Sequence, residues 1–173
     1  MWIRADRPSA PSQPQTVASD PVTGWIGLLA RLVTGGVWLV AGALKVTDPA
    51  GSVRAVRAYD LLPEALVQPV GYLLPALEIL VGVLLLLGLL TRPAAVVSAL
   101  LFVAFIVGIA SAWARGLQID CGCFGGGGFD ENAADDYPWE IARDAGLLVL
   151  SAWLVARPRT RWSLDSIVFR RTA

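Results

Sequence analysis

Long runs of apolar residues alternate with short polar segments along this chain. A helix needs about 20 mainly apolar residues to cross the hydrocarbon core of a bilayer. Four stretches reach that length, at 24–44, 70–90, 93–113 and 138–156, and each is bounded by proline, glycine or charge. Buried helices of a soluble protein are the alternative, but four such lengths with so few charges are unusual there. The pattern therefore predicts an all-α protein, an integral membrane four-helix bundle.

Composition supports a membrane protein and excludes several functions. Of the 173 residues, 55% are hydrophobic and 16% are charged, which leaves too little polar surface for a soluble domain of this size. The net charge is zero, so we expect no nucleic-acid partner, and the partner that the composition does predict is a lipid bilayer. The sequence has no histidine, which removes the commonest metal ligand and bis-histidine haem. We predict no metal site.

The polar segments divide the chain into one domain and two tails. Residues 1–22 are rich in proline, serine and glutamine and predict a disordered cytoplasmic tail. Residues 23–157 form the predicted transmembrane domain. Residues 158–173 predict a basic cytoplasmic tail.

Basic residues outside the spans predict the orientation. Eight fall on the side that holds both termini, and four fall on the other side. We therefore expect both termini in the cytoplasm, with the loops 45–69 and 114–137 outside it. The eight are Arg4, Arg7, Arg92, Arg157, Arg159, Arg161, Arg170 and Arg171, and the four are Lys45, Arg54, Arg57 and Arg115.

The two cysteines of the chain are the main candidates for chemistry. Cys121 and Cys123 are separated by Gly122 and precede a glycine run at 125–128. A disulfide between them would close a small, strained ring that a partner thiol reduces easily. The glycines would let a partner approach, while Asp120 would raise the pKa of the neighbouring thiol. Redox exchange is the favoured interpretation, and a structural disulfide or half of a shared zinc site are the alternatives.

Four charged residues fall within the predicted spans. Arg31, Glu78, Arg143 and Asp144 would be costly in lipid and are expected to face the helix interior, either to fix helix packing or to serve catalysis. Similar depths favour a Glu78–Arg143 pair, with Arg31 as the competing partner. Lys45 is predicted to be an interfacial anchor. An aromatic belt is predicted from Trp25, Trp38, Trp113, Trp139 and Trp153.

Several motifs together resemble those of the MauE branch of the DoxX-like membrane proteins. The residues that carry the resemblance are Arg31, Ala41-Gly42-x-x-Lys45, Tyr59-x-Leu-Leu-Pro63, Leu74-Pro75-x-x-Glu78, Cys121-Gly-Cys-Phe-Gly125 and Trp139-Glu-x-x-Arg-Asp144. The resemblance implies a four-helix fold in the bacterial inner membrane. It also implies that the protein supports disulfide formation outside the cytoplasm together with a thioredoxin-like, DsbA-type partner. In some relatives, the protein that receives the disulfides is methylamine dehydrogenase.

These observations lead to one mechanism and two alternatives. A partner thiolate would attack the Cys121–Cys123 disulfide, and by analogy with membrane thiol oxidases the electrons would pass to a membrane quinone near Glu78 and Arg143. One alternative is a non-enzymatic membrane scaffold with a structural cysteine pair. The other is a thiosulfate:quinone oxidoreductase subunit of the DoxX/DoxD type.

Overall fold

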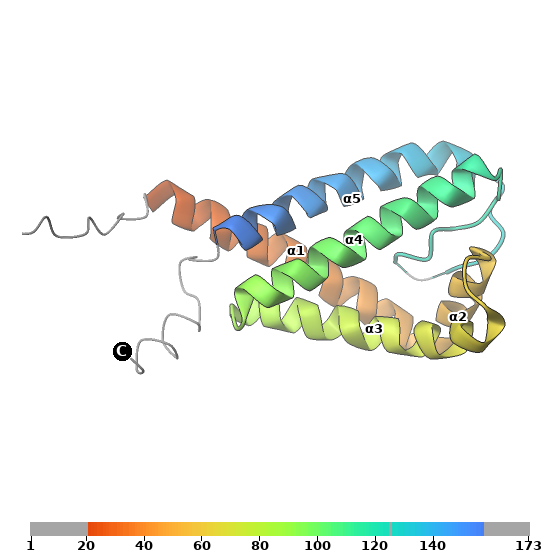
Figure 1. Cartoon of the computed structure of the whole chain (residues 1–173), viewed down its shortest axis with the longest axis horizontal. Helices are drawn as coiled ribbons and strands as arrows, with labels where there is room; N and C mark the ends of the chain where they lie inside the picture. The colour runs from red at the N-terminus through yellow and green to blue at the C-terminus, as the bar shows by residue number, and fades with distance from the viewer. Residues whose placement is uncertain (1–20, 125, 158–173) are drawn as a thin grey trace, which may run out of the picture.

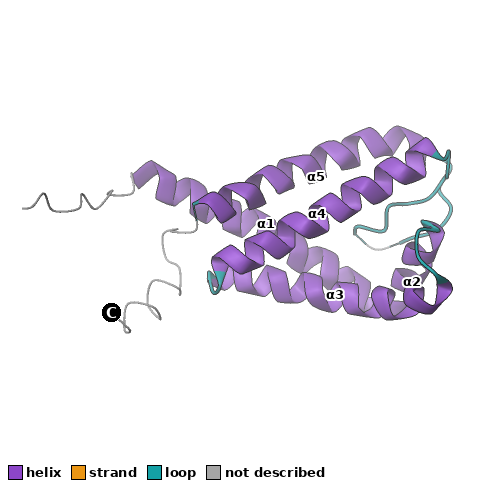
Figure 2. Cartoon of the chain, in the orientation of Figure 1, coloured by secondary structure: helices purple, strands orange, loops and turns teal. Residues whose placement is uncertain are grey.

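The computed structural model describes residues 21–124 and 126–157, and this part of the chain is all helical (Figures 1 and 2). It contains five helices and no strand, which confirms the predicted all-α class. The predicted tails lie outside the described residues, except for positions 21 and 22, which begin the first helix. The helices are α1 (Pro21–Thr47), α2 (Pro49–Ala58), α3 (Glu64–Leu87), α4 (Thr91–Ala114) and α5 (Ala133–Ala156).

The four longer helices pack along their lengths. The closest pairings are α1 with α3 and α4 with α5, while α1 also contacts α5 and α3 contacts α4 (Figure 1). The start of α1 and the end of α5 lie at one end of the molecule. At the opposite end, α2 lies beside the loop between α4 and α5.

Three of the helices, α1, α3 and α4, are long and apolar enough to cross a membrane. Helix α5 is as long as α3 but does not share their composition. It carries five charged residues, Asp135, Asp136, Glu140, Arg143 and Asp144. The predicted fourth span therefore coincides with a helix that is more polar than the other three.

The apolar runs locate the helices but not their ends. Helix α3 begins at Glu64 rather than near residue 70, because a helix continues into polar sequence wherever packing supports it. It ends at Leu87, where Gly88 takes a left-handed conformation (φ 66°) and its N–H bonds the carbonyls of Leu84 and Leu85.

Helix α2 lies in the first loop and was not predicted. Pro49 stands at its start, and the Asp48 side chain accepts a hydrogen bond of 2.9 Å from the N–H of Gly51. Both are ordinary signals for the beginning of a helix. A search for membrane spans misses such a segment because it is only 10 residues long.

A chain of polar side chains crosses the interior between three helices. Trp38 of α1 donates through Nε1 to Oγ of Ser98 on α4 at 2.7 Å, and that oxygen lies 2.9 Å from Oγ of Ser151 on α5. All three side chains are buried, and the Trp38 ring packs on Phe102. The predicted aromatic belt was therefore wrong for Trp38, which is a core residue.

Candidate dithiol site

The loop between α4 and α5 holds the cysteine pair against the ends of the helices. The hydroxyl of Tyr59, which follows α2, donates to the carbonyl of Cys121 at 2.9 Å. From α5, the hydroxyl of Tyr137 accepts from the N–H of Ile119 at 3.2 Å and lies 2.8 Å from the carbonyl of Leu117. These two tyrosines fix the loop on both sides.

Both cysteines are free thiols in the structure and are largely buried. Their exposed fractions are 9% for Cys121 and 6% for Cys123, and the N–H of Cys123 donates to Sγ of Cys121 at 3.3 Å. Gly122 has a left-handed φ of 65°, a conformation that glycine adopts without the strain of a side chain. The structure thus describes the reduced pair, and the strained disulfide stays a prediction.

Two glycines of the cysteine loop, Gly122 and Gly127, pack closely on α2. A Cβ on Gly127 would lie 2.4 Å from Cβ of Ala55, and one on Gly122 would lie 2.7 Å from the same atom. From the sequence, we expected the glycine run to let a partner approach the thiols. In the structure, Gly127 instead brings the loop backbone against Ala55 of α2.

An apolar cavity of about 270 Å³ adjoins the two thiols. It lies between α2, α3, α4 and the cysteine loop, and the end of α1 contributes one polar group, Lys45. Its walls include Tyr59, Pro75, Phe105, Cys121 and Cys123. The cavity therefore gives an apolar ligand direct access to the dithiol.

A carboxylate from α5 also lies near the first thiol. Donor atoms of Asp120, Cys121 and Glu140 all lie within 4.8 Å of one another. Oε2 of Glu140 is buried and has no hydrogen-bond partner among the described residues. A closed tetrahedral zinc site uses four protein ligands, and this cluster of described residues offers three donors at that spacing.

The surroundings keep both the thiol and the nearby phenol neutral. Hydrogen bonding with Cys123 raises the pKa of the Cys121 thiol well above its usual value, and burial and the neighbouring Glu140 raise it further. Burial also raises the pKa of Tyr59, followed by the effect of the two cysteines. Tyr59 therefore remains a hydrogen-bond donor to the loop, and Cys121 is a weak acid at neutral pH.

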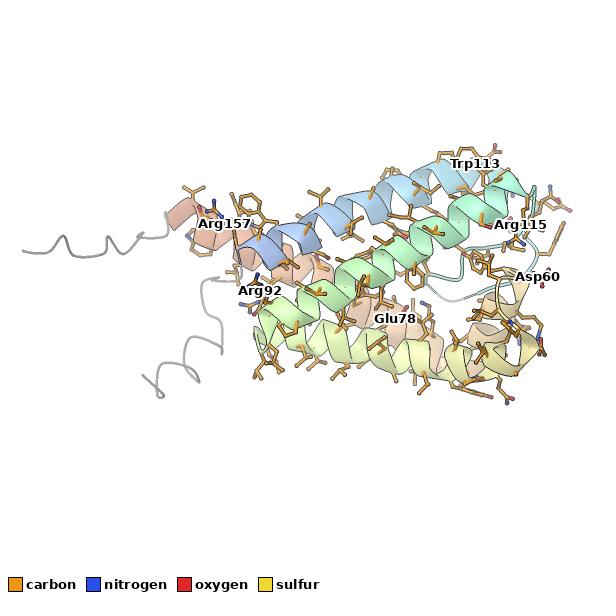
Figure 3. All side chains as sticks on the ribbon, viewed as in Figure 1. Asp60, Glu78, Arg92, Trp113, Arg115 and Arg157 are labelled. Carbon is orange, nitrogen blue, oxygen red and sulfur yellow. The ribbon has the colours of Figure 1, made fainter. Side chains whose placement is uncertain are left out.

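Glu78 pairs with Lys45, not with the arginine expected from the sequence. Oε1 of Glu78 lies 2.5 Å from Nζ of Lys45, and their side chains are 0% and 6% exposed. Figure 3 shows Glu78 midway along α3. The prediction of a Glu78–Arg143 pair was wrong, and so was that of Lys45 as an interfacial anchor, because the helix register places both side chains inside.

The other two predicted cations have separate partners. Nε of Arg143 bonds Oδ1 of Asp144 at 3.0 Å, and the Arg143 guanidinium lies 4.9 Å from the ring centroid of Phe124, beside the cysteine loop. Arg31 lies where α3 ends, and its Nε donates to the carbonyl of Leu85 at 2.8 Å. The structure therefore places Arg143 and Asp144 near the dithiol and Arg31 away from it.

Three residues of the site were not assigned to it from the sequence: Lys45, Tyr59 and Glu140. Glu140 lies three residues before Arg143, so both fall on one side of α5, and this spacing was a usable signal. For Tyr59 no such signal exists, because its contact with Cys121 spans 62 residues.

Comparison with known proteins supports the membrane assignment. A family model described as "Methylamine utilisation protein MauE" matches residues 23–157. The "Methylamine utilization protein MauE" of Paracoccus denitrificans is 41% identical over 98 residues. That match covers 56% of this chain and 53% of the relative, so the chain spans about half the length of the curated relative it matches. No solved structure matches. With its three apolar helices, the chain is a membrane protein.

Proposed function

The chain belongs to the MauE family, and we propose that it is a thiol–disulfide exchange protein of the bacterial inner membrane. The observation that carries the proposal is the pair of free thiols, two residues apart, on the wall of an apolar cavity. Methylamine utilisation is the proposed setting, because the matching family description and the relative's name both state it.

In this proposal four helices cross the membrane, with α5 as the fourth span. Helix α5 packs along α4 and also contacts α1. The charged side chain of Asp144 is buried, whereas Val149 on the same helix is 67% exposed, as expected of a residue that faces lipid. Asp144 thus faces the protein interior, while Asp135 and Asp136, in the first turn of the helix, are exposed.

The proposed orientation places the dithiol outside the cytoplasm. Arg92 and Arg157 mark one end of the molecule, while Asp60, Trp113 and Arg115 lie at the other (Figure 3). The positive-inside rule assigns the end with Arg92 and Arg157 to the cytoplasm. The cysteine loop then faces the compartment where disulfides persist.

The proposed reaction is exchange with a thioredoxin-like, DsbA-type partner. A partner thiolate attacks one sulfur of the Cys121–Cys123 disulfide and forms a mixed disulfide, while the other cysteine leaves as a thiolate. The second partner thiolate then attacks the mixed disulfide. The partner is oxidised to a disulfide, and Cys121 and Cys123 are left as two thiols.

A membrane quinone is the proposed electron acceptor. Bound beside the dithiol, it would supply a two-electron, two-proton sink. The apolar walls of the cavity fit its ring, and Nζ of Lys45 is a hydrogen-bond donor for a carbonyl oxygen. This position replaces the one expected from the sequence between Glu78 and Arg143, since those residues are engaged by Lys45 and Asp144.

Thiol trapping in intact cells tests the exchange reaction. Cys121→Ser and Cys123→Ser variants are each expected to accumulate a mixed disulfide with an extracytoplasmic partner, because the resolving thiol is missing. In the wild type, a membrane-impermeant alkylating reagent should label the pair only after mild reduction. Normal partner oxidation in the Cys121→Ser/Cys123→Ser double variant would instead identify a scaffold whose cysteines are structural.

A further inference from the structure

During thiol–disulfide exchange, the Cys121 thiol must give up a proton and later take one back. The reaction as proposed does not say which group holds that proton. The nucleophile in thiol chemistry is the thiolate, so Cys121 has to lose its proton before it attacks and regain it after it leaves. The thiol is 9% exposed, and its surroundings favour the protonated form. Histidine, the usual proton acceptor near neutral pH, does not occur in the sequence.

Glu140 is placed to take that proton. Its carboxylate lies within 4.8 Å of the Cys121 sulfur, and its Oε2 is buried without a hydrogen-bond partner in the described part of the chain. An ionised carboxylate oxygen accepts hydrogen bonds and donates none, so an unpaired one beside a thiol can receive the S–H proton. Asp120 is less available, because its Oδ1 already accepts from the N–H of Gly122 at 2.8 Å.

We propose that Glu140 is the proton acceptor and donor for Cys121. This inference rests on the proposed exchange function. When Cys121 attacks a disulfide, its S–H proton moves to the Glu140 carboxylate, a new S–S bond forms and the leaving sulfur departs as a thiolate. When Cys121 is itself displaced, the carboxylic acid of Glu140 returns the proton to its sulfur. The same group therefore serves either direction of electron flow.

Other charged groups lie near Glu140. Arg143, one helical turn further along α5, is a nearby positive charge, and Asp120 and Asp136 are nearby negative charges. Cys123, Tyr59 and Tyr137 also surround Cys121 and are neutral when protonated, and Lys45 lines the cavity on the far side of the pair.

The test is the reactivity of Cys121 as a single thiol. The full chain carrying Cys123→Ser is reconstituted in lipid nanodiscs and reacted with the uncharged disulfide dithiodipyridine across a pH series. At neutral pH, Glu140→Gln is expected to slow the reaction by about 10²-fold, the lower end of the general-base range. Glu140→Asp should recover part of the rate. Added imidazole should accelerate Glu140→Gln more than the parent, because it replaces the missing base.

Two matched controls separate proton transfer from other effects. Glu131→Gln makes the same chemical change at an exposed position before α5 and should leave the rate unchanged. In a Cys121→Ser background, where Cys123 is the reacting thiol, Glu140→Gln should have little effect on the reaction rate. Equal slowing of both cysteines would mean that Glu140 only holds the loop, which overturns the proposal.

The sign of the effect distinguishes a base from a simple charge. Removing a neighbouring negative charge by itself lowers the pKa of a thiol and speeds its reaction. An unchanged or faster reaction of Glu140→Gln would therefore overturn the proposal while leaving the exchange function intact. If the parent dithiol failed to react with any disulfide partner, the exchange function itself would be lost.

Discussion

At the scale of single residues, the cysteine loop depends on glycines that have no room for a side chain. We predict that Gly127→Ala displaces the loop from α2, because the added Cβ would lie 2.4 Å from Cβ of Ala55. A bulky maleimide should then label Cys121 and Cys123 faster than in the wild type. Gly116→Ala is the control, since that glycine also has a left-handed φ (66°) but nothing within 4 Å of the added atom. In both variants, alanine in a left-handed conformation costs about 1–2 kcal/mol, so the variants differ in the contact with Ala55. Equal labelling rates in the two variants would show that this contact is unimportant.

The buried Lys45–Glu78 pair gives a second prediction at this scale. Glu78→Gln leaves an ammonium group buried without its counter-charge, which typically costs about 3–5 kcal/mol. The thermal unfolding temperature of the purified protein should therefore fall. The double variant Lys45→Met/Glu78→Leu should recover most of the loss, because it removes both charges and keeps the volume. Failure of the double variant to improve on Glu78→Gln would mean that the pair contributes beyond charge compensation.

The raised pKa of Cys121 predicts how its reactivity depends on pH. An ordinary thiol is half ionised at about pH 8.5. Because hydrogen bonding with Cys123 and burial raise the pKa of Cys121, its thiolate fraction should keep rising above that pH. The rate of iodoacetamide modification at Cys121, followed by mass spectrometry in the Glu140→Gln variant, which lacks the proposed proton acceptor, should show no plateau near pH 8.5. A plateau at or below that value would contradict the structure.

At the scale of elements, Arg31 connects α1 to the end of α3. Its guanidinium donates to the carbonyls of Leu85 and Leu86, at 2.8 and 3.1 Å, which are among the last four carbonyls of α3 and have no N–H partner four residues further along the helix. Hydrogen bonds to charged groups contribute about 1.5–3 kcal/mol, so Arg31→Met should lower the unfolding temperature. Arg54→Met is the comparison, since Arg54 forms an exposed ion pair with Asp48 and such pairs contribute about 0–1 kcal/mol. Equal effects of the two variants would show that Arg31 does not act as a cap.

The sequence predicted elements better than it predicted contacts between them. Runs of 20 apolar residues located α1, α3 and α4, because hydrophobic length is a property of a single segment. It also singled out Cys121 and Cys123, which the structure brings together in the loop between α4 and α5; their chemical role stays a prediction. The partner of Glu78 could not be found in this way. It is separated from Glu78 by 33 residues, and the choice of Lys45 depends on how α1 and α3 are rotated against each other.

At the scale of the whole molecule, the proposed topology predicts opposite accessibility for the two ends. In a Cys121→Ser/Cys123→Ser background, cysteine is introduced in turn by Asp60→Cys and Arg92→Cys, at exposed positions at opposite ends (Figure 3). An impermeant maleimide applied to intact cells should label the first variant and not the second. Labelling of the second variant alone would reverse the orientation and place the dithiol in the cytoplasm.

The buried chain from Trp38 through Ser98 to Ser151 bears on how the protein is assembled. It joins α1, α4 and α5 through polar groups that lose their partners if any of the three helices is missing. Helix α5 also carries Asp144, whose 2% exposure depends on the helices around it. In the proposed four-span topology, an apolar segment such as α4 can enter the bilayer alone, whereas α5 needs the other helices in place to keep Asp144 out of lipid. We therefore expect α5 to insert last, after Trp38 and Ser98 have come together.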